Sequence, residues 1–313
     1  MRAGGWFLVA FIAAVLGVAI YASEVDDPPR KHAAVAPPVA PPVAPARPTP
    51  PADHVLWTAD AERPPAAEWA SSRADPSRTA PCPYSAPPDL RSSNHIRRIS
   101  DPAAQGRYAY AITTSPGDDC DGERAELGDA NPSRAGFADR LFHDGDERYI
   151  SFQVRLGSNF DVNVNTWRVI AQFHQPGGEL GPPPLALQVT NGDFVLYKGD
   201  ANVSSGSTIP VWRAPAQTGR WVKFTLHAKF SADPSVGFLE LWGNPAGGAV
   251  RLLLPKTPTY TMKKDAAGTA APLHSRIGIY RNPAGNFGTE TAYFDGFTVA
   301  TSRAAAEANA FRR

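Results

Sequence analysis

Polar side chains at three places in the chain have the types and the spacing that acid–base chemistry on an anionic ligand requires. The first place, residues 167–174, reads Trp-Arg-Val-Ile-Ala-Gln-Phe-His. Because side chains alternate across a β-strand, we expect Arg168, Gln172 and His174 on one face and mainly apolar side chains on the other. A cation, a carboxamide and an imidazole in one row would offer donors and a base to an anionic, hydroxyl-rich ligand.

The other two places follow the same alternation. Arg124 and Glu126 are separated by one alanine, and Arg276 and Tyr280 are separated by Ile-Gly-Ile. Each pair therefore lies on one face of its own strand. If the three strands are neighbours in one sheet, their polar faces converge in a common groove.

Short β-type runs separated by turn signals dominate the region that holds these motifs. The expected strands cover residues 107–114, 149–156, 167–174, 185–189, 194–197, 221–230, 237–242, 250–254, 276–280 and 291–299, with one or two more between residues 57 and 102. Asn191-Gly192 between two apolar runs is a strong hairpin signal. No segment from residue 107 to residue 300 has a helical apolar period longer than about two turns. We therefore predict an all-β fold, a concanavalin-like β-jelly-roll sandwich with one sheet curved into a groove.

The first part of the chain has a different composition. Arg2 precedes an apolar run from Trp6 to Ala22, which predicts a hydrophobic helix over residues 1–24 that acts as a signal peptide or a retained signal anchor. Under both interpretations the domain is exported, to the periplasm or outside the cell, and this helix is its only expected contact with the membrane. Residues 25–53 are rich in Pro, Ala and Val and predict an extended linker.

The remaining boundaries follow from the change in pattern. We expect the β-jelly-roll domain over residues 54–302 and a C-terminal tail over residues 303–313, where the sequence from Ser302 to Phe311 is typical of a short helix.

Charge and cysteine content limit the partners and the site chemistry. The 31 Lys and Arg residues nearly balance the 30 Asp and Glu residues, so no global field favours nucleic acid and local arginines must hold any anionic partner. Cys82 and Cys120 are expected to form a disulfide after export. No spacing suits zinc, and we predict no catalytic metal. A structural calcium could use the acidic group Asp118, Asp119 and Asp121, although its spacing is not that of a complete calcium loop.

The three motifs, taken in order, resemble a known set. Arg-x-Glu-Leu at 124–127, Gln-x-His at 172–174 and an arginine before Gly-x-Tyr at 276–280 are similar to the motifs of the jelly-roll polysaccharide lyases. The surrounding residues are most similar to the heparin lyase I-like and glucuronan lyase-like branch, which is related to the alginate lyases. The resemblance covers roughly residues 55 to 300. Where alginate lyases carry Tyr-Phe-Lys, this chain has His-Ser-Arg at 274–276, which keeps the cation and loses an aromatic ring.

The resemblance implies an activity and a set of site residues. It implies cleavage of a uronate-containing polysaccharide, of the glucuronan, heparin or alginate kind, by β-elimination and without a cofactor. The implied catalytic residues are His174, Tyr280, Gln172 and Arg124, with either His174 or Tyr280 as the base. The residues expected to bind substrate are Arg168, Glu126, Arg276, Arg281, His227 and Lys229.

Other interpretations of the same residues remain open. Arg124 and Glu126 could form a structural ion pair, and His227 could be a solvated residue on an outer strand face. The alternative function is a non-catalytic carbohydrate-binding module, which would need no general acid such as Tyr280. A glycoside hydrolase would need two carboxylates about 5 to 9 Å apart, and Glu126 has no obvious partner at strand spacing.

Overall fold

The computed structural model of the chain describes residues 53–74, 95–118, 122–129, 136–137, 140–175, 181–199 and 207–312. These residues belong to one compact unit, Pro50–Arg313. The predicted N-terminal helix, nearly all of the linker, and both Cys82 and Cys120 lie outside the described residues. The same holds for Asp119 and Asp121 of the acidic group.

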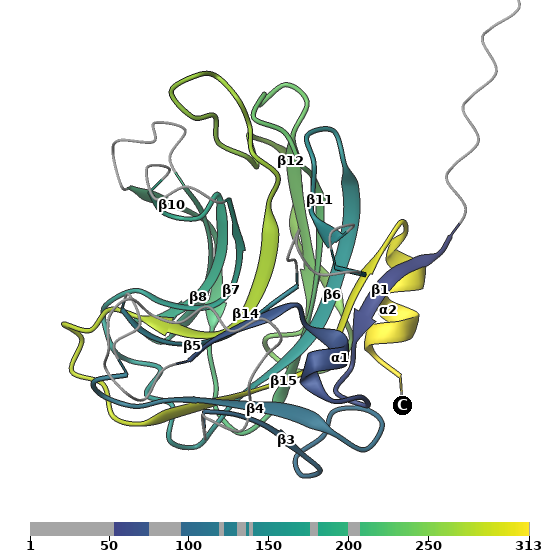
Figure 1. Cartoon of the computed structure of the whole chain (residues 1–313). Coiled ribbons are helices and arrows are strands. Elements are labelled where there is room, and N and C mark those ends of the chain that lie inside the picture. Colours follow the sequence, from purple (N-terminus) through teal and green to yellow (C-terminus); the bar gives the residue numbers. More distant parts are fainter. Residues whose placement is uncertain are drawn as a thin grey trace, which may run out of the picture. The chain divides into compact units, whose positions relative to one another are not determined.

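Two antiparallel sheets form the domain (Figure 1). The strands of the first sheet are β1 (Val55–Ala59), β3 (Ile96–Ile99), β4 (Ala109–Thr114), β6 (Glu147–Leu156), β11 (Trp221–Lys229), β12 (Phe238–Gly243), β13 (Arg251–Pro258) and β15 (Glu290–Ala300). The strands of the second sheet are β2 (Ser71–Ala74), β5 (Glu123–Gly128), β7 (Arg168–His174), β8 (Leu185–Thr190), β9 (Asp193–Gly199), β10 (Thr208–Pro215) and β14 (His274–Arg281). The two helices of the described part are α1 (Pro65–Glu68) and α2 (Arg303–Ala310).

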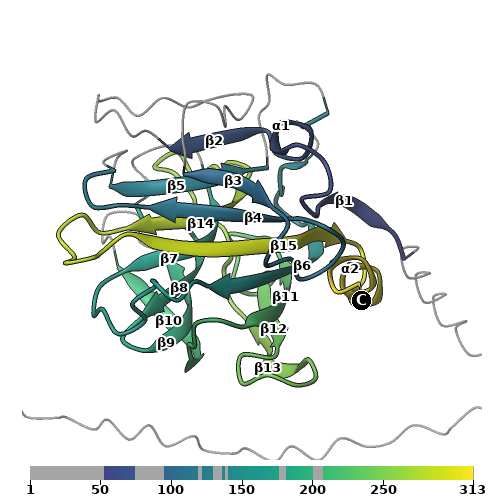
Figure 2. The same cartoon turned by 90° about the horizontal axis from the view of Figure 1, so that it is seen from below.

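Strands distant in the sequence become neighbours in each sheet. The first sheet has the order β13-β12-β11-β6-β15-β4-β3, with β1 paired to β15, and the second has the order β10-β9-β8-β7-β14-β5-β2. Figure 2 shows β4, β15 and β6 side by side in the first sheet. The predicted all-β sandwich is confirmed, and β5, β14 and β7, which carry the three motifs, are neighbours.

The core lies between the two sheets and follows from the alternation of apolar side chains. Phe152 and Phe224 come from the first sheet, Leu187 and Phe194 come from the second, and all are buried in one hydrophobic cluster. Each buried side chain of this size contributes about 1.5 to 3 kcal/mol through the hydrophobic effect. The outer faces of both sheets are thereby left for polar side chains.

A β-bulge interrupts the alternation of β7. On the side of β8, Val169 pairs with Gln188 and Ala171 with Leu187, so Ile170 is an extra residue. Both Ile170 and Ala171 are buried in the core cluster. The side chains before the bulge therefore lie on the opposite face of the sheet from the one that strict alternation predicts.

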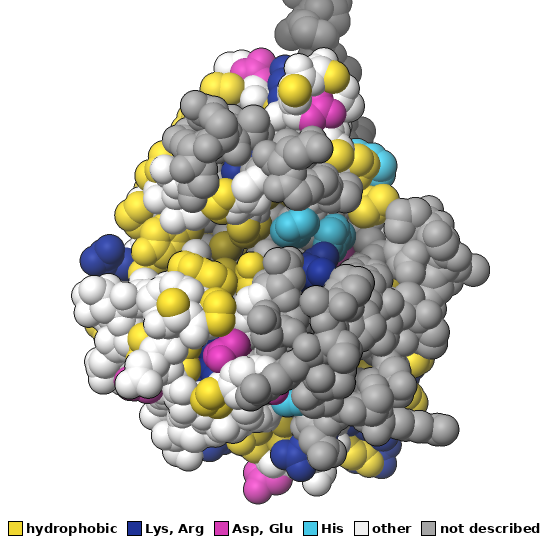
Figure 3. Space-filling view, turned by 60° about the vertical axis from the view of Figure 1, so that its left-hand side comes forward, with side chains coloured by type: hydrophobic (Ala, Val, Ile, Leu, Met, Phe, Trp, Pro, Cys, Tyr) yellow, Lys and Arg dark blue, Asp and Glu magenta, His cyan; other side chains and the backbone are white. Residues whose placement is uncertain are grey.

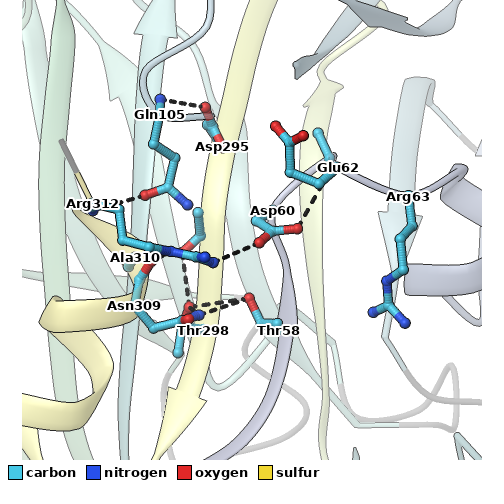
Figure 4. Close-up of polar contacts among 12 residues, drawn as sticks. Thr58, Asp60, Glu62, Arg63, Gln105, Asp295, Thr298, Asn309, Ala310 and Arg312 are labelled. Atoms are coloured by element: carbon cyan, nitrogen blue, oxygen red, sulfur yellow. Dashed lines mark hydrogen bonds and ion pairs between the residues drawn. The ribbon is translucent and has the colours of Figure 1, made fainter. Parts of the chain in front are cut away.

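The C-terminal helix α2 packs on the first sheet (Figures 2 and 4). Ser302 caps it by accepting a hydrogen bond from the Ala305 amide at 3.1 Å. Gln153 donates to the Ala310 carbonyl at 2.9 Å, and Arg312 contacts Asp60 at 2.7 Å. The helix predicted in the tail is confirmed. Neither helix of the described part has the length and apolar character that a membrane crossing needs.

Candidate active site

The outer face of the second sheet carries a row of polar side chains that we name the polar strip. It comprises Arg73 on β2, Arg124 and Glu126 on β5, Gln172 and His174 on β7, and His274, Arg276 and Tyr280 on β14. Cross-strand register places His274 opposite His174, and Arg276 opposite Gln172. The view in Figure 3 shows histidine and Lys or Arg side chains together in a recess of the surface.

Glu126 is the centre of the polar strip. Gln172 donates its Nε2 hydrogen bond to Oε1 of Glu126. Oε2 of Glu126 lies 3.3 Å from Nε of Arg124 and 3.7 Å from Nη1 of Arg276. All four side chains are buried, with between 2% and 7% of their surface exposed. One carboxylate thus holds a carboxamide and two guanidinium groups in place, and the structural ion pair between Arg124 and Glu126 is present.

Close packing of β14 on β5 keeps these groups together. A Cβ on Gly278 would lie 2.1 Å from the backbone oxygen of Ala125, and Gly278 has a φ of +149°. Only glycine permits this approach without displacing the neighbouring strand. The spacing of Arg276 and Tyr280 relative to Arg124 and Glu126 depends on it.

His174 and His274 form one end of the polar strip. Their ring centroids are 5.4 Å apart. Burial, together with Arg276, Arg124, Arg73 and Lys263, lowers the pKa of His174 to about 3. Burial and Arg276 lower the pKa of His274 to about 2. Both imidazoles are therefore neutral near pH 7, and each has a ring nitrogen that can accept a proton or a hydrogen bond.

The hydrogen bonding of one imidazole and one carboxamide of the polar strip is incomplete among the described residues. Nδ1 of His174 and Oε1 of Gln172 are both buried and have no hydrogen-bond partner there. Buried polar atoms in folded proteins are normally paired, because an unpaired one costs about 1 to 3 kcal/mol. Such atoms are expected where a ligand completes the hydrogen bonding.

Tyr280 lies at the other end of the polar strip. The Arg124 guanidinium stacks on its ring, 3.5 Å from the centroid, and the Trp167 ring packs against it in a T-shaped arrangement with 4.8 Å between the ring centroids. Tyr280 is opposite Val169, five residues before His174 on β7, or about 17 Å along a strand. The predicted placement of His174 and Tyr280 in one sheet is confirmed, but a considerable length of strand separates their backbones.

Arg73 and Lys263 are two cations near His174 that the sequence did not indicate. Arg73 is opposite Glu126 in register. Lys263 is buried in a loop that Gln175 fixes, because the Lys263 amide donates to Gln175 at 2.7 Å and its carbonyl accepts at 2.9 Å. The alternation of β2 could have indicated Arg73 once β2 was known to pair with β5. No sequence pattern points to a loop lysine.

Arg168 and Arg281 do not lie on the polar strip, so this part of the prediction was wrong. Both are fully buried on the core side, where Arg168 contacts Glu290 at 2.5 Å. Arg281 contacts Glu123 at 2.7 Å and Glu290 at 2.9 Å. The bulge at Ile170 turns Arg168 inward, and Arg281 points away from Tyr280 because adjacent strand residues face opposite sides. These arginines are structural cations of a buried ion-pair network.

The prediction that His227 and Lys229 join the site was also wrong. They lie on β11 of the first sheet. His227 is held between Glu147 at 2.9 Å and Glu240 at 2.8 Å, and it stacks on Tyr149 with 3.9 Å between centroids. Alternation showed that these side chains point outward, but a sandwich has two outer faces, and alternation does not say which one.

An antiparallel β-sandwich whose outer face carries arginines, a glutamine, neutral histidines and a tyrosine has the features of a carbohydrate-active enzyme that handles acidic sugars. A family model described as Polysaccharide lyase matches residues 67–298. The chain belongs to this family, and the expectation that it is a polysaccharide lyase is confirmed.

Solved structures with a similar fold include three proteins of low sequence identity. The endo-β-1,4-glucuronan lyase from the fungus Trichoderma reesei is 18% identical, with a TM-score of 0.48, and the match covers 71% of this chain and 94% of that one. The PL-14 alginate lyase from Aplysia kurodai is 12% identical, with a TM-score of 0.43 and coverage of 66% and 87%. The catalytic domain of a glycoside hydrolase family 131 protein from Coprinopsis cinerea is 13% identical, with a TM-score of 0.45 and coverage of 79% and 94%. No curated protein matches the chain.

Proposed function

We propose that this polysaccharide lyase cleaves a uronate-containing polysaccharide by β-elimination and leaves an unsaturated uronate at the new end. The observation that carries the proposal is the composition of the polar strip. A neutral imidazole with a buried, unpaired Nδ1 lies beside two arginines, Arg124 and Arg276, that share one carboxylate, Glu126. A base beside surplus positive charge suits proton removal next to a carboxylate.

Neutralisation of the uronate carboxylate is the first requirement of the reaction. The proton on C5 is weakly acidic, and its loss places negative charge on the neighbouring carboxylate. Arg276 and Arg124 would stabilise this charge, with Gln172 fixed near them by its hydrogen bond to Glu126. Because these groups are buried, their interaction with the developing charge is stronger than it would be in water.

His174 is proposed to remove the C5 proton. The electron pair of the C5–H bond forms the C4=C5 double bond, the bond from C4 to the glycosidic oxygen breaks, and that oxygen takes up a proton. Burial and the nearby cations lower the pKa of His174 to about 3. A bound carboxylate offsets the charge of Arg276 and Arg124, so substrate binding raises this pKa towards the range useful for a general base.

Tyr280 is proposed to donate the proton to the departing oxygen. Trp167 and Arg124 pack against its ring and restrict its orientation. A Cβ on Gly122 would lie 2.7 Å from Cε2 of Tyr280, so this glycine leaves room for the ring. Transfer to the same sugar requires the phenol to extend along the strip towards Gln172.

The test is an assay of the purified full-length protein with glucuronan, alginate, heparin and hyaluronan, followed by ultraviolet absorbance of the unsaturated product. We expect product from at least one of them, and loss of turnover with retained binding in His174→Ala and Tyr280→Phe. The matched control His143→Ala, at an exposed turn, should be fully active. A folded protein that binds these polymers but releases no unsaturated product from any of them would instead be a carbohydrate-binding module.

The remaining expectations are parts of the same proposal. The elimination uses side chains and requires no cofactor, and the acidic polysaccharide is the partner, with no role for nucleic acid. The apolar run at residues 6–22 supports export to the periplasm or the cell exterior, with this segment as the contact to the membrane.

A further inference from the structure

His274 belongs to the polar strip, but the mechanism above gives it no task. It is 9% exposed and lies directly opposite His174. Its Nε2 is 3.0 Å from Nε of Arg276, which lies two residues further along the same face of β14. A histidine in this place makes a specific hydrogen bond with an arginine that faces the site.

The contact fixes the protonation state of His274. The Nε–H group of an arginine can only donate, so Nε2 of His274 must be the acceptor. The imidazole is then neutral and carries its proton on Nδ1. A positively charged His274 would lose this acceptor and place two cations in contact.

The contact also restricts Arg276. An arginine has five donors in a planar fork, and rotation of this plane would change which of them face a ligand. His274 holds the fork at Nε, while Glu126 lies 3.7 Å from Nη1. A guanidinium held at two of its edges presents its other donors in a fixed direction, which favours two-point binding of a carboxylate.

We propose that His274 is a positioning residue of the lyase, which accepts the Arg276 Nε hydrogen bond and thereby orients the guanidinium towards the substrate carboxylate. This inference rests on the proposed function and extends it to a residue outside the expected catalytic set. A lysine at position 276 would have no Nε–H group of this kind, so the histidine serves the arginine specifically.

A double-mutant cycle tests the coupling. On whichever polysaccharide the enzyme cleaves, His274→Leu should lower kcat/KM by about 10- to 100-fold, as expected for a hydrogen bond to a charged group. His274→Gln should recover most of the activity, because its amide oxygen can accept from Nε. In an Arg276→Lys background, His274→Leu should have no further effect. The control His143→Leu should leave kcat/KM unchanged.

Nuclear magnetic resonance of ring nitrogens tests the contact without any substrate. In full-length protein labelled with ¹⁵N-histidine, the His274 signals, identified by their loss in His274→Leu, should show protonated Nδ1 and unprotonated Nε2 between pH 5 and 8. A doubly protonated His274 at pH 6, or the opposite tautomer, would overturn the proposal. The proposal would also be overturned if the fold-losses in kcat/KM of His274→Leu and Arg276→Lys simply multiplied in the double variant. If no polysaccharide is cleaved, the proposed function fails, while the nitrogen signals still decide whether the contact exists.

Discussion

The polar strip concentrates positive charge that the whole chain does not have. The formal net charge is +1, yet Arg124 and Arg276 share Glu126 on the outer face of one sheet, and Arg73 lies opposite Glu126 in register. In a partly buried site these charges act at close range and are screened less than surface charges. Local arginines can therefore attract an acidic polymer without a basic surface elsewhere, as the balanced composition led us to expect.

Glu126 is the residue at which binding and turnover can be separated. Glu126→Gln keeps an oxygen that accepts from Gln172, but it removes the charge that holds Arg124 and Arg276. We expect kcat to fall by about tenfold, since the cations lose their fixed orientation. We expect KM to stay constant or fall, because the charge that competes with the substrate carboxylate is gone.

Steady-state kinetics on the cleaved polysaccharide would measure both constants. The control Glu240→Gln changes a carboxylate on the first sheet, whose partner is His227, and should alter neither constant. A rise in KM with unchanged kcat would show that Glu126 itself binds substrate and would contradict this assignment.

At the scale of the elements, alternation and turn signals predicted most strands, but they missed one edge strand and one β-bulge. The Asn191-Gly192 turn has positive φ at both residues, 50° and 83°, as its sequence predicted. Strand β10 was missed because it contains Pro210, which disfavours a strand in general, although an edge strand tolerates proline. The bulge at Ile170 was also missed, since it depends on how β7 pairs with β8 and not on β7 alone.

This difference determines which site residues could be found from the sequence. Gln172 and His174 follow the bulge and have the expected orientation, whereas Arg168 precedes it and does not. The partners of Glu126 and the contact between His274 and Arg276 depend on strand order and side-chain packing. A sequence pattern predicts which side chains share one face of a strand, but the order of the strands in the sheet decides which of these side chains become neighbours.

Gly278 is expected to be essential for the packing of β14 on β5. In Gly278→Ala the added methyl group meets backbone, which cannot move like a side chain, so we expect a loss of about 3 kcal/mol or more in the free energy of unfolding. For a domain of this size, that corresponds to a fall in Tm of about 6 to 12 °C.

Thermal unfolding of Gly278→Ala and of the control Gly248→Ala would separate the steric part of this loss in stability from the part that is due to backbone conformation. Gly248 also has a positive φ, 77°, but a Cβ added to it would meet no atom within 4 Å. Equal losses in the two variants would mean that backbone conformation, and not the contact with Ala125, makes the glycine necessary.

Asp129 follows β5, and its side chain adds hydrogen bonds to those that pair β5 with β14. Its Oδ1 accepts from the Ser275 amide at 2.9 Å, and Oδ2 accepts from the Ser275 hydroxyl. Burial raises the pKa of Asp129 from 3.8 to about 7. The folded state therefore binds the proton more tightly than the unfolded state, and the resulting stability is complete below pH 3.8 and is lost as the pH rises through 7.

Asp129→Asn should remove this pH dependence. An asparagine can accept from the Ser275 amide and donate to its hydroxyl, as a protonated aspartate does. Above pH 7 the variant should be more stable than the wild type, by up to about 4 kcal/mol from the shift in pKa. Chemical unfolding from pH 5 to 9 measures the difference, and Asp144→Asn, in an exposed turn, serves as the control. Parallel pH profiles for Asp129→Asn and the wild type would refute the assignment.

At the scale of the whole molecule, the two ends of the described chain close the sandwich on the side of the first sheet. Strand β1 pairs with β15, and α2 packs on β15 and β6. Asn309 donates to Thr58 at 3.0 Å and to Thr298 at 2.8 Å, so one side chain joins helix, first strand and last strand (Figure 4). The active-site candidates lie on the other sheet, so this packing of the chain ends is separate from the polar strip.

Removal of residues 303–313 tests this separation. The truncation leaves the buried Gln153 amide without its acceptor, Ala310, and removes the contact of Arg312 with Asp60. We expect a loss of at least about 2 kcal/mol, or a fall in Tm of about 4 to 8 °C. At 25 °C kcat/KM should be unchanged, because α2 packs on strands of the first sheet and the polar strip lies on the second. The control Arg213→Ala breaks an exposed pair with Asp193 at 3.8 Å and should cost less than about 1 kcal/mol. An unchanged Tm would show that α2 does not stabilise the domain. Lost activity in a folded protein would show that changes on the first sheet affect the polar strip on the second.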